Sequence, residues 1–282
     1  MSFATLTVDK HAVADGQFIA YTTYKPTTTT TALSHTFVCV AGLGETRHTY
    51  RHLAPLLADA GHMVLTVDLR GMGHSSTGFS SFSVEACTSD IESLLEHKVG
   101  ADDKVVMVGN SFAAACIVLL QSPKVVASAI LGPFVRDLPG VGPKVFNAIA
   151  PAMFARPYGA SVWMSYWKTL FGAHAQDFAA YEAFLKTNIK EQGRLRALVK
   201  LVQASKANAG SHLHEYKLPM LIGMGSADPD FACAQDEAHY IHDTIASTTK
   251  EVVMFPNMKH YPQAECPAEV ATSLTAFLAK VV

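Results

Sequence analysis

Short apolar runs rich in β-branched residues recur in the first half of the chain and again near its end. Unbroken runs of this kind are typical of strands buried on both faces of a parallel sheet. They predict strands at Gln17–Tyr24, Thr36–Ala41, Met63–Val67, Val105–Val108, Val125–Leu131, Met220–Gly225 and Glu251–Phe255, and weaker alternation adds one at Ala4–Val8.

Stretches with apolar residues at helical spacing separate most of these strands. They predict helices at Tyr50–Ala60, Ser83–His97, Ala114–Gln121, Cys233–Ile245 and Pro267–Lys280, whereas the polar run Thr27–Thr31 is expected to be a loop. Strands that alternate with helices predict an α/β fold with right-handed crossovers. We therefore expect a mostly parallel, doubly wound sheet of about eight strands.

The pattern changes after the strand Val125–Leu131. From residue 133 to residue 218 no convincing strand occurs, and aromatic and aliphatic residues recur at helical spacing instead. This predicts a helical insertion at 133–218 between two parts of one core, 1–132 and 219–282. Trp163, Tyr166 and Trp167 form one stripe of a predicted helix, which either packs the insertion against the core or lines a pocket.

Composition narrows the class of protein. The chain has 282 residues, of which 49% are hydrophobic, enough for one large α/β domain with an insertion. A net charge of −2 gives no basic face for nucleic acid, and no apolar run is long enough to span a membrane. The N-terminus lacks a signal-peptide pattern, and the five cysteines are an odd, scattered set, so we expect a cytoplasmic protein.

The chemistry centres on Ser111. The sequence Gly109-Asn110-Ser111-Phe112-Ala113 lies between a predicted buried strand and a predicted helix. Small residues two positions on either side permit a very tight turn that exposes the serine hydroxyl beyond the strand. The simpler alternative is a serine that caps an ordinary helix.

Two later loops contain the groups that would activate such a serine. Gly225–Asp230 follows one predicted strand, and Pro256–Pro262 follows the last. With the Ser111 turn, they make the chain resemble the α/β-hydrolase superfamily over most of its length. In that family a serine, an acid and a histidine occur in this order along the chain.

The resemblance implies that Ser111 is the nucleophile, Asp228 the acid and His260 the base. Asp230 and Asp137 are the alternative acids. Ala113 stands where glycine is common in the family, and Met258-Lys259 precede the histidine where a glycine is usual.

The resemblance also implies an oxyanion hole formed by the backbone N–H groups of Leu43 and Phe112. The residue before this loop's first glycine is Ala41, where the family commonly has histidine. The insertion at 133–218 matches the family's cap, which would make Trp163, Tyr166 and Trp167 candidate pocket residues.

The function expected from the resemblance is a serine hydrolase that cleaves a carboxylester or lactone of a small, fairly apolar molecule through an acyl-enzyme. Alternatives on the same fold are a carbon–carbon bond hydrolase, a cofactor-free haloperoxidase and a non-catalytic ligand receptor. No cofactor is expected, the expected partner is a small molecule, and the oligomeric state is not predicted.

Two further patterns suggest other kinds of site. Gly42-x-Gly44 with Asp68 after the next strand is typical of nucleotide-binding oxidoreductases, but the bulky Arg47 occupies the third glycine position. The pair His48 and His52 has the spacing of a zinc site but lacks the glutamate of a zinc protease. No metal site is therefore expected.

Overall fold

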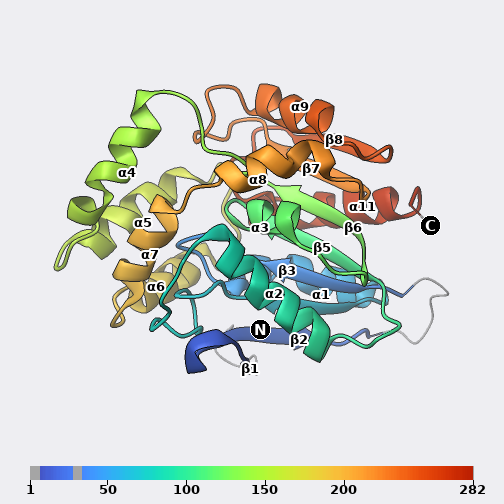
Figure 1. Cartoon of the computed structure of the whole chain (residues 1–282), viewed down its shortest axis with the longest axis horizontal. Coiled ribbons are helices and arrows are strands. Elements are labelled where there is room, and N and C mark those ends of the chain that lie inside the picture. The colour runs from blue at the N-terminus through green and yellow to red at the C-terminus, as the bar shows by residue number, and fades with distance from the viewer. Residues whose placement is uncertain (1–6, 28–33, 282) are drawn as a thin grey trace.

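A computed structural model of the chain describes residues 7–27 and 34–281. Most of the strand predicted at Ala4–Val8 and most of the loop Thr27–Thr31 lie outside the described residues. The described strands form one sheet of eight in the order β1-β2-β4-β3-β5-β6-β7-β8 (Figure 1). Their bounds are β1 Asp9–Ala12, β2 Phe18–Tyr24, β3 Thr36–Val40, β4 Met63–Val67, β5 Val105–Asn110, β6 Val125–Leu131, β7 Met220–Gly225 and β8 Lys250–Phe255.

The sheet is mostly parallel. Only the pairs β1–β2 and β2–β4 are antiparallel, and every pair from β4 through β8 is parallel. This confirms the predicted α/β fold. Because parallel strands end at the same edge of a sheet, the loops after β3, β5, β6, β7 and β8 are brought together.

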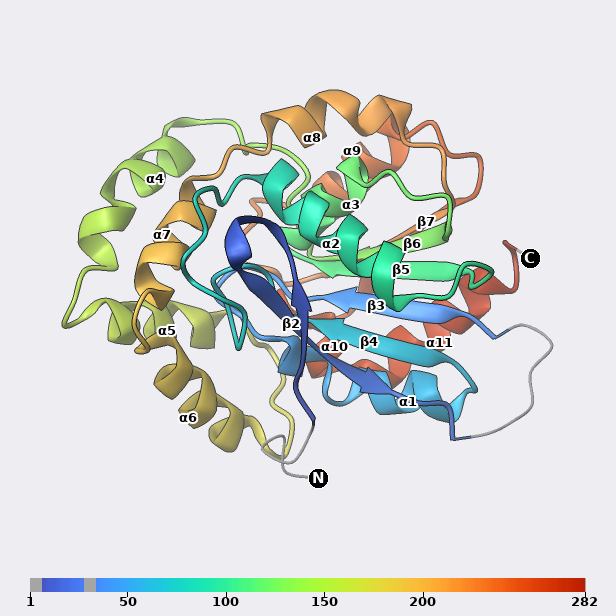
Figure 2. The same ribbon diagram turned by 60° about the horizontal axis from the view of Figure 1, so that its bottom comes forward.

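Helices cover both faces of the sheet (Figure 2). Successive side chains of a strand point to opposite faces, so Val38 and Val40 pack with one set of helices and Phe37 and Cys39 with the other. The first face carries α2 (Val84–Lys98), α3 (Ala113–Leu119) and α9 (Ala234–Thr244), and the second carries α1 (Leu53–Asp59) and α11 (Pro267–Leu278), which the short α10 (Pro262–Glu265) precedes.

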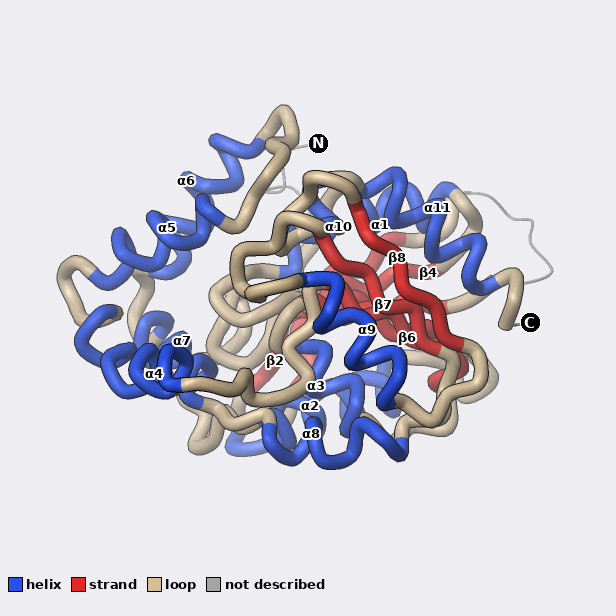
Figure 3. Tube along the Cα trace, turned by 90° about the horizontal axis from the view of Figure 1, so that it is seen from above, coloured by secondary structure: helices blue, strands red, loops and turns tan. Residues whose placement is uncertain are grey.

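The residues between β6 and β7 contain five α-helices and no strand. Four of these helices gather beyond the end of the sheet, and the fifth, α8, returns to lie beside α3 (Figures 1 and 3). Their bounds are α4 Val141–Met153, α5 Gly159–Thr169, α6 Phe178–Ile189, α7 Arg194–Gln203 and α8 Ala207–His212. Within residues 7–27 and 34–281, no helix combines the length and the apolarity needed to cross a bilayer.

Candidate active site

A cavity of about 430 Å³ lies between the carboxyl edge of the sheet and helices α4 and α5. One wall comes from the loops after the strands and contains Leu43, Ser111, Phe112, Asp230 and His260. The other comes from the helical segment and includes Phe146, Trp163 and Tyr166. Residues that are far apart in the sequence therefore meet at one cavity, which is the usual form of a small-molecule site.

Ser111 occupies the turn between β5 and α3 with a φ of 56°, a conformation that residues other than glycine rarely adopt. The turn is held by hydrogen bonds from Ser111 N to Leu131 O at 2.9 Å and from Phe134 N to Ser111 O at 3.2 Å. Space around it is scarce, because a Cβ at Gly109 would approach the side chain of Ile117 to 2.6 Å. Strained serine backbone that the surrounding fold enforces is typical of functional positions.

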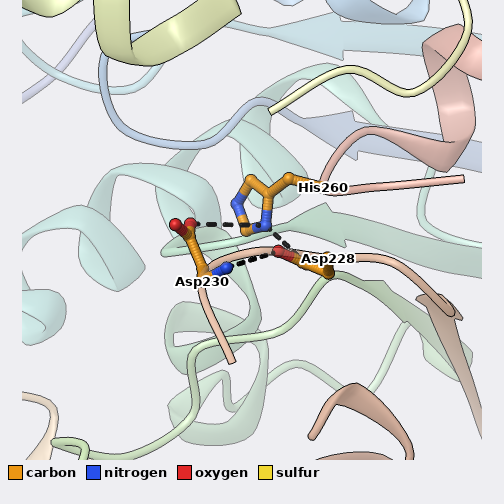
Figure 4. Close-up of side chains that lie close together, drawn as sticks. All are labelled: Asp228, Asp230 and His260. Carbon is orange, nitrogen blue, oxygen red and sulfur yellow. Dashed lines mark hydrogen bonds and ion pairs between the residues drawn. The ribbon is translucent and has the colours of Figure 1, made fainter. Parts of the chain in front are cut away.

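His260 lies in the loop after β8 and forms a hydrogen bond between its Nδ1 and Asp228 Oδ2 at 2.8 Å (Figure 4). Because a carboxylate can only accept, Nδ1 carries the proton, which leaves Nε2 free to take one. Burial opposes the charge on the imidazolium. Asp228 and Asp230 together outweigh that effect and raise the pKa of His260 to about 9.

Three other contacts fix the position of this histidine. The side-chain amide of Asn110, the residue before the serine, donates to Leu131 O at 2.9 Å and to His260 O at 3.1 Å. The backbone N–H of His260 donates to Leu170 O at 3.1 Å. The histidine loop is therefore joined to the serine turn and to the helical segment. In the described part of the chain, Ser111 Oγ and His260 Nε2 have no hydrogen bond to each other.

Two backbone amides at the cavity lack acceptors. Leu43 lies in the loop after β3, and Phe112 comes directly after the serine at the start of α3. Neither N–H has an acceptor in the described ranges, although most buried amides in proteins are paired. The loop that contains Leu43 lies directly against the serine, since a Cβ on Gly42 would come within 2.9 Å of Ser111 Cβ.

The three predicted acids have different surroundings. Asp228 is buried and bonds to His260. Asp230 reaches the same nitrogen only at 3.6 Å, and its other oxygen accepts the hydroxyl of Tyr166. Asp137 lies at the cavity, but its oxygens accept from Ser205 and from the backbone of Lys206.

The stripe of aromatic residues on α5 divides between the cavity and the interior. Trp163 and Tyr166 line the cavity, and Trp163 Nε1 donates to Gly44 O at 3.1 Å. Trp167 is fully buried, stacks on Phe178 and donates to Glu45, and it is absent from the residues described around the cavity. Its assignment to the pocket is corrected, because the buried Glu45 carboxylate fixes its indole inside the protein.

Asp68 and Arg47 bear on the nucleotide-binding alternative. Both side chains are fully buried, and Arg47 Nη1 lies 2.6 Å from Asp68 Oδ2. The Asp68 carboxylate also accepts the backbone N–H of Arg47 and of His74. With its oxygens occupied in this way, Asp68 is not placed to bind a ribose, and the arginine in the third glycine position is its partner.

Donor atoms of Asp228, Asp230 and His260 all lie within 4.8 Å of one another, close enough to surround one small cation. The Nδ1 proton of His260 and the hydroxyl of Tyr166 already bond to the two carboxylates. This group is therefore satisfied by its own hydrogen bonds.

Sequence reasoning missed two charged groups of this region. Glu45 is fully buried under α5 and α6, where it accepts from Trp167 and Tyr181. Lys206 lines the cavity, and the residue as a whole is buried. Glu45 comes directly after Gly44, and that position was the one available signal, whereas nothing in the sequence around Lys206 distinguishes it from a surface lysine.

Comparisons with known proteins agree with this architecture. A sequence model of the alpha/beta hydrolase family matches residues 37–273. Epoxide hydrolase A of Mycobacterium tuberculosis is 37% identical over 95 residues, which is 32% of this chain and 29% of that protein. The match therefore spans less than a third of the relative's length.

Solved structures resemble the whole chain. A thermophilic esterase from Thermogutta terrifontis, solved with malate bound, has a TM-score of 0.77 at 18% identity, covering 98% of this chain and 99% of that one. A bromoperoxidase from Bacillus anthracis has a TM-score of 0.78 at 18% identity, covering 97% and 100%. At this identity the two likenesses concern the fold alone.

Proposed function

The chain belongs to the alpha/beta hydrolase family, and on this premise we propose that it is a serine hydrolase that cleaves a carboxylester or lactone through an acyl-enzyme. One observation carries the proposal. Ser111 in a strained turn, His260 bonded to Asp228, and two amides without acceptors all meet at one cavity. Each group alone has a structural explanation, but their convergence matches the requirements of acyl transfer.

The reaction begins with attack of Ser111 Oγ on the carbonyl carbon of the substrate. His260 Nε2 takes the hydroxyl proton as the new carbon–oxygen bond forms, and Asp228 stabilises the resulting imidazolium through Nδ1–H. Ser111 Oγ is not bonded to Nε2, so the serine hydroxyl must first rotate toward that nitrogen. Catalytic hydrogen bonds of this kind often form only when the substrate is bound. The negative oxygen of the tetrahedral intermediate accepts from Leu43 N–H and Phe112 N–H.

Breakdown of this intermediate returns the proton. The bond to the leaving oxygen breaks, and His260 donates its proton to that oxygen, which departs as the alcohol. Water then attacks the acyl-serine while His260 takes one of its protons. Collapse of the second intermediate releases the carboxylic acid and restores the serine hydroxyl.

Serine at this position favours acyl chemistry over the opening of an epoxide. Attack of a serine oxygen on an epoxide carbon would produce an alkyl ether, which has no carbonyl for water to attack. The enzyme would stop after one event. The local likeness to an epoxide hydrolase is therefore not carried over to the activity of this chain.

The helices beyond the sheet edge are proposed to act as a cap. Phe146 of α4 and Trp163 and Tyr166 of α5 contribute to the cavity wall opposite the serine. The cap so defined consists of α4 to α7. Its end falls before residue 218, because α8 packs beside α3 of the core.

The proposal is tested with purified Ser111→Ala and Asp228→Asn on a panel of 4-nitrophenyl esters of increasing chain length, with lactones alongside. The first change removes the attacking oxygen and should lower kcat by about 10⁴-fold or more. The second deprives His260 of its orienting acceptor and should lower kcat by about 10⁴-fold. Ser81→Ala, at an exposed serine, is the matched control and should retain full activity.

Labelling separates an enzyme from a silent receptor. A fluorophosphonate should modify the wild type on the peptide that contains Ser111 and should leave Ser111→Ala unmodified. Turnover by Ser111→Ala at the wild-type rate would exclude the serine as nucleophile. Absence of both labelling and turnover in the wild type would favour the receptor.

A further inference from the structure

Lys206 lies shortly after α7 and brings a cation to the cavity next to the proposed nucleophile. Its Nζ lies 5.3 Å from the centre of the ring of Phe112, the residue after Ser111. The side chain lines the same cavity as Ser111 and His260, and the residue is only 9% exposed. The protein therefore covers most of this lysine, whose side chain contributes to the cavity wall.

This ammonium has unused hydrogen-bond donors. Of its three N–H groups, one donates to Ala204 O at 3.1 Å, and within the described ranges Nζ makes no ion pair. Asp137 is close enough to favour the charge, but its oxygens accept from Ser205 and from the backbone N–H of Lys206. Burial is the larger influence and lowers the pKa of Lys206.

Lys206 differs in this respect from the other buried cations. Among the described residues, four arginines are also buried, and each of them has a carboxylate partner. The pairs are Arg47–Asp68, Arg51–Asp177, Arg70–Asp90 and Arg194–Glu191. Burial of a cation without a partner lowers the stability of the folded protein. The unpaired Lys206 therefore needs an explanation, and we look for it in the molecule that occupies the cavity.

We propose that Lys206 binds a carboxylate of the substrate, so that the enzyme acts on esters or lactones that carry a free acid group away from the bond that is cleaved. This inference rests on the proposed function and specifies its substrate class. The carbon chain between the two ends of such a substrate would lie against Phe112 and Phe134, which line the cavity. Lys206 selects and positions the substrate and takes no part in bond breaking.

The proposal changes the expected substrate. The family resemblance implies a small, fairly apolar substrate, and this expectation takes no account of Lys206 in the loop after α7. The cavity lining combines apolar side chains with Lys206 and with a serine beside two amide donors. Of the other two cations of the lining, Arg136 is paired with Glu237 and Lys144 is exposed. A monoester of a linear dicarboxylic acid supplies an ester for the serine and a carboxylate for Lys206.

Turnover tests the inference with a matched pair of substrates. Monoethyl adipate and ethyl 5-carbamoylpentanoate have nearly the same shape, but only the first carries a charge at its far end. Ethanol release is measured for both, together with shorter and longer homologues, because the spacing of ester and acid must match the cavity. The wild type should prefer the acid at the best chain length.

Three variants identify the source of the preference. Lys206→Met keeps the apolar stem and should lower kcat/KM for the acid by about 10- to 100-fold, with less than about a threefold change for the amide. Lys206→Arg keeps the charge and should retain the preference. Lys168→Met removes a half-exposed lysine of α5 that pairs with Glu182 of α6, and it should leave kcat/KM for both substrates unchanged. Equal effects of Lys206→Met on acid and amide, or no preference in the wild type, would overturn the inference.

Binding without turnover keeps this result separate from the proposed function. Ser111→Ala, alone and combined with Lys206→Met, is titrated with the same two esters by calorimetry. Tighter binding of the acid that disappears in the double variant supports the role of Lys206 even if the wild type hydrolyses nothing. Equal affinities for acid and amide would reject that role even if Ser111 proves to be the nucleophile.

Discussion

Helices α4 and α5 belong to the same segment and line the same cavity, yet they are attached to the protein in different ways. Three side chains of α5 make polar contacts with loops at the sheet edge: Trp163 with Gly44 O, Tyr166 with Asp230 and Trp167 with Glu45. In α4 the only buried residue is Ala150. Its Val141, Val145 and Ile149 are 74%, 49% and 45% exposed.

The difference arises from the kind of apolar residue in each helix. Tryptophan and tyrosine rings bury a large surface and also carry an N–H or O–H that can bond to a fixed acceptor. The valines and isoleucine of α4 have no such group. Because these side chains are exposed, they contribute little to the attachment of α4 to the rest of the protein. We therefore expect α5 to be part of the rigid frame of the site and α4 to be the wall that adjusts to the substrate.

Glu45 tests the rigid side of this comparison and should give the largest effect. Burial raises the pKa of Glu45 from 4.5 to about 7. The folded protein thus keeps a proton that the unfolded chain loses, and this contribution to stability is full below pH 4.5 and is lost as the pH rises through 7. For this group alone the free energy of unfolding should fall by about 3 kcal/mol across that range.

The measurement is urea unfolding of wild type and Glu45→Gln at pH 5 and pH 7.5. The free energy of unfolding of the variant should lack this part of the pH dependence. The contributions of all other titrating groups are the same in both proteins and cancel in the comparison. Glu96→Gln, at an exposed glutamate, should behave like the wild type. An unchanged pH dependence in Glu45→Gln would mean that the carboxylate does not control how α5 is held.

Asp230 links α5 to His260. Removal of the charge of Asp230 should have an effect of intermediate size on catalysis. Its carboxylate helps to raise the pKa of His260, which must be neutral to accept the serine proton. Asp230→Asn should therefore lower that pKa and move the acid limb of the kcat/KM profile to lower pH by about one unit. Asp236→Asn, on the exposed side of α9, is the matched control, and a limb that stays in place would contradict the prediction.

Phe146 tests the variable side and should give the smallest effect. The side chain is half-buried and lines the cavity, and among the described residues its one ring contact is with Phe154, at 6.3 Å between centres. Phe146→Ala should raise KM about threefold and leave kcat unchanged, with a loss of about 1 kcal/mol of stability. Val145→Ala, one residue away and half exposed, should change neither constant. A large fall in kcat for Phe146→Ala would place α4 in the rigid frame as well.

Much of the fold was predictable because each signal is local. The apolar runs of β3 to β8 lie within a residue or two of their predicted bounds. Ser111, Asp228 and His260 could be expected to lie close together because each follows the end of a strand, and the ends of parallel strands meet at one edge of the sheet. The helical character of residues 133–218 was likewise evident from the spacing of apolar side chains.

The remaining features depend on contacts that no local pattern records. Trp167 and Trp163 are one turn apart on the same helix, but Trp167 bonds to Glu45 and stacks on Phe178 in the interior. Lys206 becomes buried because the chain after α7 passes Phe112, which is far away in sequence. Burial of a charged group is a property of the assembled structure, so sequence alone gave no reason to notice it.

The order of the strands has a consequence for biosynthesis. The cavity needs residues from the loop after β3 and from the loop after β8, and the strand that bears Ser111 lies in the middle of the sheet. A nascent chain halted before β8 would contain the serine turn and helices α4 and α5 but would lack β8 and the loop that contains His260. Recovery of enzymatic turnover during refolding should accordingly come only after the docking of the last strand, and partial products of translation should remain inert.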